Sequence, residues 1–580
     1  MKMVNIKINE NSLSVEEGTT ILSAAKRLKI KIPTLCHLNL HEIELENKRA
    51  SCRVCMVEVV NTGRLVAACA TPVYEGMEIK TESAKAIKAR RAIVELLLSN
   101  HPTECLTCAK NMNCELQKLA ADLGIRKIHY SGEKNNFKID VDSLSIKRDP
   151  NKCILCKRCE TACNETQTVG ALATIGRGFN TYVGSTFDRS MHNTVCTFCG
   201  QCVAVCPTGA LTEINNIGEL WNVLHDNSKY VIVQTAPAIR VAIGEEFGFE
   251  PGENLTGKMV SALRNLGFSK VFDTNFAADL TVMEEAHEFA DRLKNGGKIP
   301  ILTSCCPSWV NFMEQQFPDM LDIPSSCKSP HEMFGAVAKT YFAEKEGINP
   351  EDIVVVSVMP CVAKKYESAR EELMNNGTRD VDIVITTREL GIMIKESGIN
   401  FELLNEDEFD NIMGESSGAG AVFGSTGGVI EATVRTAYEW LTGKELGYME
   451  FTELRGIKGI KTTELEIEGR LIKIAVANGL GNTRRLLEKI KKKEVHFDAI
   501  EVMACPGGCI GGAGQPYHYG DLSILRKRAE GIYKVDRDKK IRKAHENPMI
   551  KELYEEFLER PGSEKSEELL HTKYKARPRL

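Results

Sequence analysis

The second half of the chain has the apolar pattern of an α/β domain. From Tyr230 to about residue 520, short apolar runs alternate with stretches in which apolar positions recur every three to four residues. Such runs are typical of strands covered on both faces, and the stretches between them predict helices. The pattern therefore predicts a mainly parallel sheet with helices between its strands. The expected strands are YVIVQTA (230–236), PILTS (300–304), IVVVSVM (353–359), VDIVIT (381–386), KIAVA (473–477) and FDAIEVM (497–503).

The first 80 residues alternate shorter apolar runs with turn residues, which predicts a small α+β module. TTILSAAKRLKI (19–30) has the three-to-four spacing of a helix. The expected strands are VNIKI (4–8), MVEVV (56–60) and LVAACA (65–70).

The regions between and after these two parts carry further patterns. Residues 83–99 predict an amphipathic helix that leads into a His/Cys group, and the polar residues 115–150 predict a connector. Residues 151–214 hold two similar cysteine runs about 43 positions apart, which indicates an internal duplication. The last 60 residues are charged and predict helices, and they end in the basic sequence HTKYKARPRL.

Composition narrows the class of protein only a little. A chain of 580 residues is long enough for several domains, and 43% hydrophobic and 26% charged residues are ordinary for a globular protein. The net charge of −5 gives no indication of a nucleic-acid partner. No apolar run is long enough for a membrane span, and the first residues lack the apolar core of a secretory signal. The chain is therefore expected to be soluble and cytoplasmic.

Cysteine is the residue type that changes this picture. Clusters among 21 cysteines, in a large chain without an export signal, indicate metal sites more than disulfides. CILCKRCETAC (153–163) and CTFCGQCVAVCP (196–207) have the spacing of two-cluster bacterial ferredoxins, in which the fourth cysteine ligates the other cluster. The expected ligands are Cys153, Cys156, Cys159 and Cys206 for one 4Fe–4S cluster, and Cys163, Cys196, Cys199 and Cys202 for a second. The alternative is a pair of zinc ribbons, but zinc sites use C-x2-C pairs instead of four-cysteine runs.

Two further groups lie closer to the N-terminus. Cysteines spaced C-x15-C-x2-C-x13-C fail a strict match to plant-type ferredoxins, yet their α+β surroundings favour a 2Fe–2S site, with zinc as the alternative. These are Cys36, Cys52, Cys55 and Cys69. The second group, H-x3-C-x2-C-x5-C, leaves one position of a 4Fe–4S cluster open for the histidine, although a lone histidine is more often structural. It consists of His101, Cys105, Cys108 and Cys114. Both groups resemble those of the large iron–sulfur subunit of respiratory complex I.

Three stretches contain five of the six remaining cysteines. They are TSCCPSW (303–309), MPCVAKKYE (359–367) and EVMACPGGCIGGAGQP (501–516). They resemble the three signatures of iron-only (FeFe) hydrogenases, TSCCPxW, MPCxxKxxE and ExMxCxxGCxxGGGxP. Ala513 stands where the third signature has glycine. The resemblance covers essentially the whole chain, in the domain order of the large clostridial enzymes.

This resemblance implies a multidomain fold: α+β ferredoxin-like N-terminal modules and a large α/β H-cluster domain of two halves. Ligands in α/β domains gather at the carboxyl ends of strands, which several of these cysteines follow. The implied ligands of the 4Fe–4S part of the H-cluster are Cys306, Cys361, Cys505 and Cys509. Cys509 would also bridge to a two-iron subsite that carries CO, cyanide and azadithiolate and is inserted by maturation proteins.

The expected domain boundaries follow from these motifs. They are 1–80 for a 2Fe–2S ferredoxin-like domain, 81–125 for a His/Cys3 4Fe–4S domain, 140–220 for a two-4Fe–4S ferredoxin domain, 228–520 for the H-cluster domain and 521–580 for a helical small-subunit-like segment. Together they imply an H-cluster, three further 4Fe–4S clusters and one 2Fe–2S cluster.

By the same resemblance, Cys305 passes protons to the bridging amine and Lys364 bonds a cyanide of the subsite. The alternatives are a small buried thiol and a surface lysine. Met359 and Met503 are expected to pack against the two irons, or simply to fill the core. Ala238 and His331 stand where well-known stand-alone enzymes carry serine and glutamine, and both are expected near the H-cluster.

The predicted helix LTVMEEAHEFADRLK (280–294) places three charged residues, Glu285, Glu288 and Arg292, on one face at i, i+3 and i+7. By spacing alone, an ordinary solvated face with a Glu288–Arg292 pair is favoured. The resemblance instead implies a proton path. It would run through Arg292, Glu288, Ser325, Glu285 and Cys305. Cys327 has no assignable role and is expected in the core.

The implied reaction is heterolytic cleavage of H2, and its reverse from protons, with electrons carried along the iron–sulfur chain. One partner arrangement is a stand-alone enzyme that uses ferredoxin. The other, favoured by Ala238 and the form of the third signature, is the catalytic subunit of an NAD-linked, electron-bifurcating complex. The chain has no G-x-G-x-x-G after a strand, so flavin and NAD would be bound by partner subunits. A hydrogenase joined to a formate dehydrogenase, a hydrogen sensor and an assembly factor are further possibilities. The presence of Cys305, Glu285, Glu288 and Lys364 favours turnover.

Overall fold

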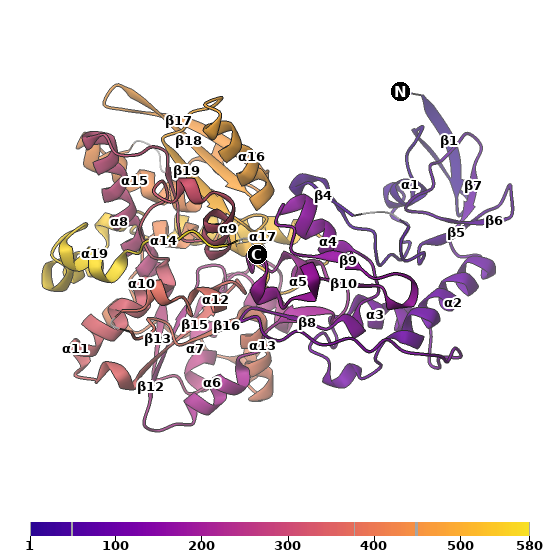
Figure 1. Cartoon of the computed structure of the whole chain (residues 1–580), viewed down its shortest axis with the longest axis horizontal. Helices are drawn as coiled ribbons and strands as arrows, with labels where there is room; N and C mark the ends of the chain where they lie inside the picture. Colours follow the sequence, from indigo (N-terminus) through magenta and orange to yellow (C-terminus); the bar gives the residue numbers. More distant parts are fainter. Residues whose placement is uncertain (1, 48–49, 376, 447–449, 579–580) are drawn as a thin grey trace.

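The computed structural model describes residues 2–47, 50–375, 377–446 and 450–578. Residues 1–220, here called the cysteine-rich region, lie to the right in Figure 1. Residues 228–520, the two-sheet region, lie to the left together with the C-terminal segment, residues 521–578. Within the described ranges, no helix is both long and apolar enough to cross a membrane.

The N-terminal module is a five-stranded sheet in the order β2-β1-β7-β5-β6. Its strands are β1 (Met3–Ile8), β2 (Asn11–Glu16), β5 (Met56–Val59), β6 (Arg64–Ala67) and β7 (Glu78–Lys80). The predicted helix is α1 (Ile21–Arg27), which begins where the Thr20 side chain accepts a hydrogen bond from the Ser23 amide. The three predicted strands are present, the last of them shorter, and β2 and β7 were not predicted.

The predicted amphipathic helix is α2 (Ala84–Asn100), with Ser83 as its N-cap residue. The prediction that residues 115–150 form only a connector is wrong. This stretch contains α3 (Glu115–Asp122) and β8 (Ile146–Arg148). Leu116 and Leu119 bury one face of α3, and so short an apolar pattern is hard to distinguish in a polar stretch.

The two cysteine runs adopt the same backbone conformation, as expected for a duplication. Leu155 and Phe198 have φ of 53° and 57°, and Lys157 and Gly200 have φ of 64° and 69°. Each run then enters a short helix, α4 (Arg158–Thr161) or α5 (Gln201–Val205). Two small antiparallel pairs frame the runs: β8 with β11 (Leu211–Glu213), and β9 (Ala173–Ile175) with β10 (Tyr182–Gly184).

The two-sheet region contains two four-stranded sheets. The first, in the order β13-β12-β15-β16, is entirely parallel. It consists of β12 (Tyr230–Thr235), β13 (Lys270–Asp273), β15 (Ile353–Met359) and β16 (Ile383–Thr386). In the second, β14-β19-β18-β17, only the β17–β18 pair is antiparallel. It consists of β14 (Ile301–Leu302), β17 (Ile460–Ile467), β18 (Arg470–Asn478) and β19 (Ala499–Met503). All six predicted strands are present, and β13 and β17 were not predicted.

Helices cover both sheets (Figure 1). Those that position the site are α8 (Thr274–Asn295), α9 (Pro307–Gln316), α10 (Pro330–Val337), α12 (Lys364–Glu367) and α15 (Gly428–Thr442). The others in this region are α7 (Thr256–Asn265), α11 (Ala343–Glu346), α13 (Thr387–Glu396), α14 (Gly418–Val422) and α16 (Leu480–Lys491). α6 (Ile217–Leu224) comes just before this region in the chain and packs on its first sheet. The parallel strands run through fully buried residues such as Val233 and Val356, which explains their continuous apolar sequences.

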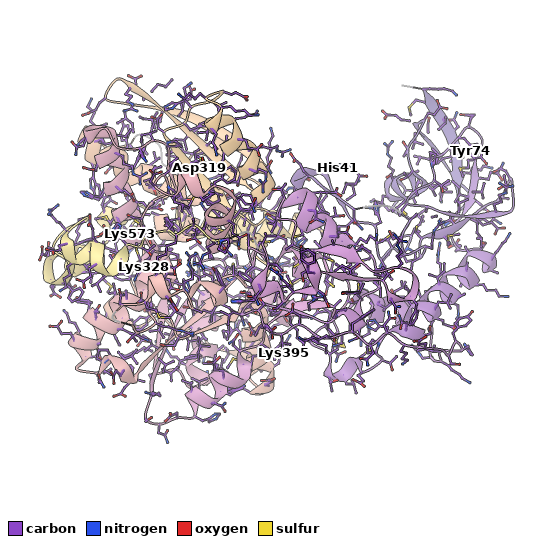
Figure 2. The ribbon with its side chains drawn as sticks, in the orientation of Figure 1. His41, Tyr74, Asp319, Lys328, Lys395 and Lys573 are labelled. Atoms are coloured by element: carbon purple, nitrogen blue, oxygen red, sulfur yellow. The ribbon has the colours of Figure 1, made fainter. Side chains whose placement is uncertain are left out.

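The C-terminal segment is helical, as predicted: α17 (Leu522–Asp538), α18 (Pro548–Leu553) and α19 (Glu564–Leu570). After α19 it packs on the loop around Lys328, and Figure 2 labels Lys328 and Lys573 on the two sides of this contact. His571 forms an isolated antiparallel bridge with Cys327, and the Arg577 guanidinium is bonded to Glu314 at 2.8 Å. The basic tail is therefore docked as far as it is described, and its Arg579 lies outside the described residues.

Candidate active site and iron–sulfur sites

The four cysteines predicted to hold the H-cluster lie where strands of both sheets end. Cys306 is the N-cap residue of α9, just after β14. Cys361 follows β15, Cys505 follows β19, and Cys509 begins a short 3-10 turn. Because β15 belongs to the first sheet and β14 and β19 to the second, these thiols lie between the two halves of the region.

The third signature needs its glycine before Cys509. Gly508 has φ of +86°, and a Cβ there would lie 2.6 Å from the Thr426 amide nitrogen. The departure at Ala513 is accommodated, because its methyl group packs where Gly200 has no side chain. The loop therefore keeps the backbone that the signature requires.

The thiols of this group fit a cluster held by thiolates. Burial raises the pKa of Cys361 and of Cys509 to about 12, with the Cys306 and Cys361 thiolates as further causes. The surrounding protein groups therefore favour the neutral thiols. Bound iron would favour the thiolates, because its positive charge stabilises them.

A cavity of about 60 Å³ adjoins these thiols. It is lined almost entirely by apolar atoms and has few polar groups, as expected for a site that excludes water. Of the predicted site residues, its lining includes Cys305, His331, Met359, Cys361, Lys364, Met503 and Cys509. Sequence reasoning missed its other lining residues, Ala236, Pro237, Thr274, Pro330, Pro360 and Phe423.

Lys364 lies at the wall of this cavity in a buried ion-pair cluster. Its Nζ is 2.6 Å from a carboxylate oxygen of Glu367 and donates to the Cys305 carbonyl at 3.2 Å. Burial alone would lower the pKa of Lys364, but the Glu367 carboxylate outweighs it and raises the pKa. Lys364 is therefore a fixed cation at the cavity, and the alternative of a surface lysine is wrong.

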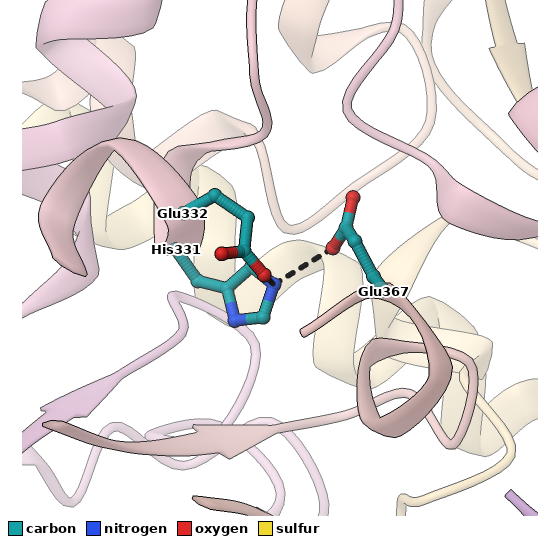
Figure 3. Close-up of side chains that lie close together, drawn as sticks. All are labelled: His331, Glu332 and Glu367. Atoms are coloured by element: carbon teal, nitrogen blue, oxygen red, sulfur yellow. Dashed lines mark hydrogen bonds and ion pairs between the residues drawn. The ribbon is translucent and has the colours of Figure 1, made fainter. Parts of the chain in front are cut away.

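His331 connects this ion pair to a second carboxylate (Figure 3). Its Nε2 lies 2.7 Å from Glu367 and 2.9 Å from Glu332, and all three side chains are buried. Their ligand atoms lie within 4.8 Å of one another, as in a metal site. Because the Lys364 ammonium already bonds Glu367, the cluster is an ion-pair network instead of a cation site. Glu367 was detectable in the sequence as the last residue of the second signature, three positions after Lys364.

Ala238 lies outside the cavity lining, which its neighbours Ala236 and Pro237 reach. It is fully buried, and its carbonyl accepts a hydrogen bond from Gln515 at 3.0 Å. It belongs to the same apolar cluster as Cys509, so the structure places it behind the site.

Arg292, Glu288 and Ser325 are joined by direct bonds. Arg292 pairs with Glu288 at 2.5 Å, and the Ser325 hydroxyl donates to the other Glu288 oxygen at 2.7 Å. Both charged side chains are mostly buried, at 13% and 17% exposed. The expectation of an ordinary solvated face is wrong here, because the 323–326 loop covers this part of α8 and the C-terminal segment packs on that loop.

Glu285 lies deeper than Glu288. It is 2% exposed, accepts a long hydrogen bond of 3.4 Å from the Thr433 hydroxyl, and its Oε1 has no partner among the described residues. Burial raises its pKa to about 8, and the charge of Glu288 adds to the shift. Its charge also influences the Cys305 thiol, although no direct bond joins Glu285 to Cys305 or to Ser325 in the described part of the chain. Cys327, as expected, is buried in the core.

Sequence reasoning also missed the role of Glu501. Its carboxylate accepts hydrogen bonds from the amides of Gly427, Val429 and Ile430 at 2.6, 2.9 and 3.1 Å. These are unpaired donors at the start of α15, so Glu501 fastens this helix to β19 next to the site. The signal was present, because Glu501 is the first residue of the third signature.

The N-terminal cysteines also form one group. The Cys36 amide donates to the Cys52 sulfur at 3.4 Å, and hydrogen bonds between thiols link Cys36 with Cys69 and Cys69 with Cys55. All four side chains are buried. The group is compact enough for a small cluster.

His101 lines one cavity with Cys105, Cys108 and Cys114. Its Nδ1 is buried without a hydrogen-bond partner among the described residues. Burial, helped by the charge of Lys152, lowers its pKa to about 4, so the imidazole is neutral. A neutral ring with a free nitrogen next to three thiols is suited to ligate a metal.

The two ferredoxin-like runs cross over as expected. Cys153, Cys156, Cys159 and Cys206 line one cavity. The second set lies together as well, since the charges of Cys163 and Cys196 both raise the pKa of Cys202, after burial and Cys199. The fourth cysteine of each run therefore lies with the first three of the other.

A set of cysteine sites together with an apolar cavity lined by thiols, methionines and a fixed lysine defines the class of an iron–sulfur oxidoreductase. Comparisons with known proteins agree. Residues 229–513 match the family described as "Iron only hydrogenase large subunit, C-terminal domain", and residues 522–577 match "Iron hydrogenase small subunit". The cysteine-rich region matches three iron–sulfur families. They are a "2Fe-2S iron-sulfur cluster binding domain" (1–84), the "NADH-ubiquinone oxidoreductase-G iron-sulfur binding region" (90–129) and the "NADH-quinone oxidoreductase subunit 3, ferredoxin-like domain" (143–212).

Relatives that are similar over the whole chain identify the family within this class. NADP-reducing hydrogenase subunit HndD of Solidesulfovibrio fructosivorans is 55% identical, with 100% of both chains covered. Iron hydrogenase 1 of Clostridium pasteurianum is 40% identical over 99% of this chain and 100% of its own. The structure of apo [FeFe]-hydrogenase HydA1 from Chlamydomonas reinhardtii superposes with a TM-score of 0.58 at 42% identity, covering 63% of this chain and 100% of that chain. This chain belongs to the FeFe hydrogenase family.

Proposed function

We propose that this chain is the catalytic subunit of a multisubunit hydrogenase that exchanges electrons between H2 and a nicotinamide nucleotide, with ferredoxin as a second carrier. The observation that carries the proposal is the thiol-lined cavity between the two sheets, with Cys305, Lys364 and both methionines at its wall. When bound there, an H-cluster supplies the iron chemistry that cleaves or forms H2.

The protein's own residues have three tasks in this proposal. The first is to hold the metal, which falls to Cys306, Cys361, Cys505 and Cys509. The second is to keep the cavity dry and oriented, which the apolar lining and Lys364 do. Because Lys364 is held by Glu367 and by the Cys305 carbonyl, its ammonium can donate to an anionic ligand without reorganisation.

The third task is to move protons between the cavity and the surface. Cys305 would exchange a proton with the bound group, and Glu285 with Cys305. The outer half, Ser325, Glu288 and Arg292, would carry the proton outward along bonds of 2.7 and 2.5 Å. Glu285 suits the inner position, because a pKa of about 8 lets it both give and take a proton near neutral pH.

Electrons would pass through the cysteine-rich region. We assign a 2Fe–2S cluster to the N-terminal group, and one 4Fe–4S cluster each to the His101 group and the two crossed cysteine sets. The charge of Cys199 influences the Cys505 thiol, which supports a short step from the nearest of these sites to the H-cluster.

The choice of nucleotide-linked partners rests on two observations. HndD, which is similar over the whole chain, is called an NADP-reducing hydrogenase subunit. This chain lacks the glycine-rich nucleotide fingerprint, so NAD(P) and flavin would be bound by partner subunits in a hetero-oligomer. Electron bifurcation between the nucleotide and ferredoxin is the arrangement that we favour.

The test is anaerobic H2 evolution by the matured chain alone, with reduced ferredoxin as donor and reduced viologen as control. We expect activity with viologen and almost none with ferredoxin until nucleotide-binding subunits are added. Brisk evolution with both donors would instead identify a stand-alone ferredoxin hydrogenase. No activity with either donor, in a preparation that contains the two-iron subsite, would contradict turnover and leave a hydrogen sensor.

A further inference from the structure

Asn47 is a buried amide that joins the N-terminal cysteine group to one of the ferredoxin-like cysteine sets. It follows β4 (Leu45–Glu46) and is only 1% exposed. Its Nδ2 donates to the Cys36 carbonyl at 2.7 Å and to the Cys156 carbonyl at 2.9 Å. One neutral side chain therefore bonds the backbones of two cysteines that are distant in the chain and belong to different proposed clusters.

Hydrogen bonds fix the orientation of the Asn47 amide. A carbonyl oxygen only accepts hydrogen bonds, so the amide nitrogen has to face both cysteine carbonyls. The amide oxygen accepts a hydrogen bond from the Thr161 hydroxyl at 2.6 Å, and Thr161 is the last residue of α4. The backbone amide of Asn47 donates to the Leu38 carbonyl at 2.9 Å, within the N-terminal module. The side chain is therefore bonded at both of its polar atoms, as buried polar groups generally are, and is held in a single orientation.

The surroundings of Asn47 bring the two cysteine groups close together. Cys36 and Cys156 belong to one buried apolar cluster, and β4 contacts the segment that follows α4 (Figure 1). The Arg158 guanidinium adds a hydrogen bond of 3.4 Å to the His37 carbonyl. Because Asn47 and both cysteines are buried, water has little access to the two bonds between them. A continuous run of covalent and hydrogen bonds thus connects a thiol of one group with a thiol of the other.

We propose that Asn47 is the positioning residue for electron exchange between the N-terminal 2Fe–2S site and the 4Fe–4S site of Cys153, Cys156, Cys159 and Cys206. Its two hydrogen bonds fix the separation of the sites and provide a bonded path between them. In each step one electron leaves one cluster and enters the other, and no bond forms or breaks. Because the amide is neutral, it adds no charge that would favour the reduced form of either cluster. The inference rests on the proposed function, which assigns clusters to both sites.

The test is pulse radiolysis of the full chain after anaerobic reconstitution, with iron and sulfide measured in the same samples. Time-resolved absorption separates the two kinds of cluster, and the phase that does not depend on protein concentration reports electron exchange between them. Asn47→Leu removes both donors and adds no charge. We expect this phase to slow about tenfold, because a displacement of about 1 Å can slow a geometry-dependent step by up to about 10²-fold. The final extent of reduction of each cluster should not change.

Asn61→Leu is the matched control. The Asn61 amide also bonds two backbone groups of the N-terminal module, those of Gly76 and Glu78, but none that belongs to a cysteine. Its loss should therefore weaken the module without affecting the link between the two sites, and the exchange rate of the parent chain should be kept.

An unchanged exchange rate in an Asn47→Leu chain with full iron content would overturn the proposal, as would a parent chain without an exchange phase. If this variant loses iron, Asn47→Ser, which keeps one donor, is measured under the same criterion. Loss of iron from both variants, or equal slowing in Asn61→Leu, would show that Asn47 acts on the stability of the module and not on electron exchange, which also overturns it. Absence of iron and sulfide from the parent chain would instead contradict the proposed function, so the two failures are distinguishable.

Discussion

The cysteine-rich region and the two-sheet region hold their thiols in different ways. In the first, the cysteines are themselves part of a core: Cys159, Cys196, Cys202 and Cys206 belong to one buried cluster, and the strands around them are only three residues long. That cluster continues into the two-sheet region through residues such as Trp309 and Ile500. In the second, longer strands build a large apolar core, and the thiols are placed at strand ends. We therefore expect the proposed metal sites to complete the fold in the first region, and the fold of the second to form without its metal.

Removal of iron should produce the largest effect, a difference in amide protection between the two regions. In the metal-free chain we expect amide protection to fall at least 100-fold across residues 143–212 and less than threefold in β12 and β15, because only the former need their ligated thiols to stay packed. Hydrogen exchange read by mass spectrometry measures both regions in one sample. Equal losses in the two would break the comparison.

Cys305→Ala should leave the fold intact and stop the reaction. We expect H2 evolution with reduced viologen to fall at least 100-fold, because the proposed path loses its innermost proton carrier. Cys327→Ala is the matched control: this thiol is also buried, at 1% exposed against 9% for Cys305, but is not a member of the proposed path, so its loss should cost about 0.5–3 kcal/mol of stability and little activity. Similar activities in the two variants would argue against a relay at Cys305.

Glu285 should make the reaction dependent on pH. Its pKa is raised to about 8, so the carboxyl is protonated at neutral pH and loses its proton as the pH rises through about 8. The rate of H2 evolution should therefore decline above pH 8, towards tenfold per unit, and Glu285→Gln should be slow and lack this limb. The pH–rate profile of the viologen assay measures both chains. If the decline in rate above pH 8 persists in Glu285→Gln, another group is responsible for it.

Tyr574→Phe should give the smallest effect. The Tyr574 hydroxyl donates to the Ser325 carbonyl at 2.6 Å, and loss of this bond should cost about 0.5–1.5 kcal/mol. We expect a lower melting temperature of the two-sheet region and a two- to threefold slower rate, with no change in the spectra of the iron–sulfur sites. A change in those spectra would show that the two regions are coupled through the C-terminal segment.

Strands and the grouping of cysteines could be predicted from the sequence because both depend on local patterns. Val233 and its neighbours form one apolar run, and the spacing of Cys153, Cys156 and Cys159 predicts a cluster loop without knowledge of the fold. β13, β17 and α3 were missed or misjudged, because each is short or half exposed and has a weak pattern. The burial of Glu288 could not be predicted either, since the residues that cover it are distant in the chain.

Contacts between distant parts of the chain could not be predicted on the polar side of the candidate active site either. Lys364 and Glu367 are three positions apart, so their pair could have been expected from the sequence. His331 and Glu332 come from another helix, and no local pattern indicates that they join this pair.

The contact between the C-terminal segment and the loop at Ser325 also affects the order in which the protein is completed during synthesis. Ser326 and His571, whose side chains lie 2.8 Å apart, are separated by 245 residues of chain. A ribosome that adds 5–20 residues per second needs roughly 12 to 50 s to cover that interval. Throughout it, the loop can bond Arg292 and Glu288 but lacks its C-terminal partner. The C-terminal cover over the proposed outer proton path is thus one of the last contacts to form during synthesis, after all strands of the two-sheet region have been made.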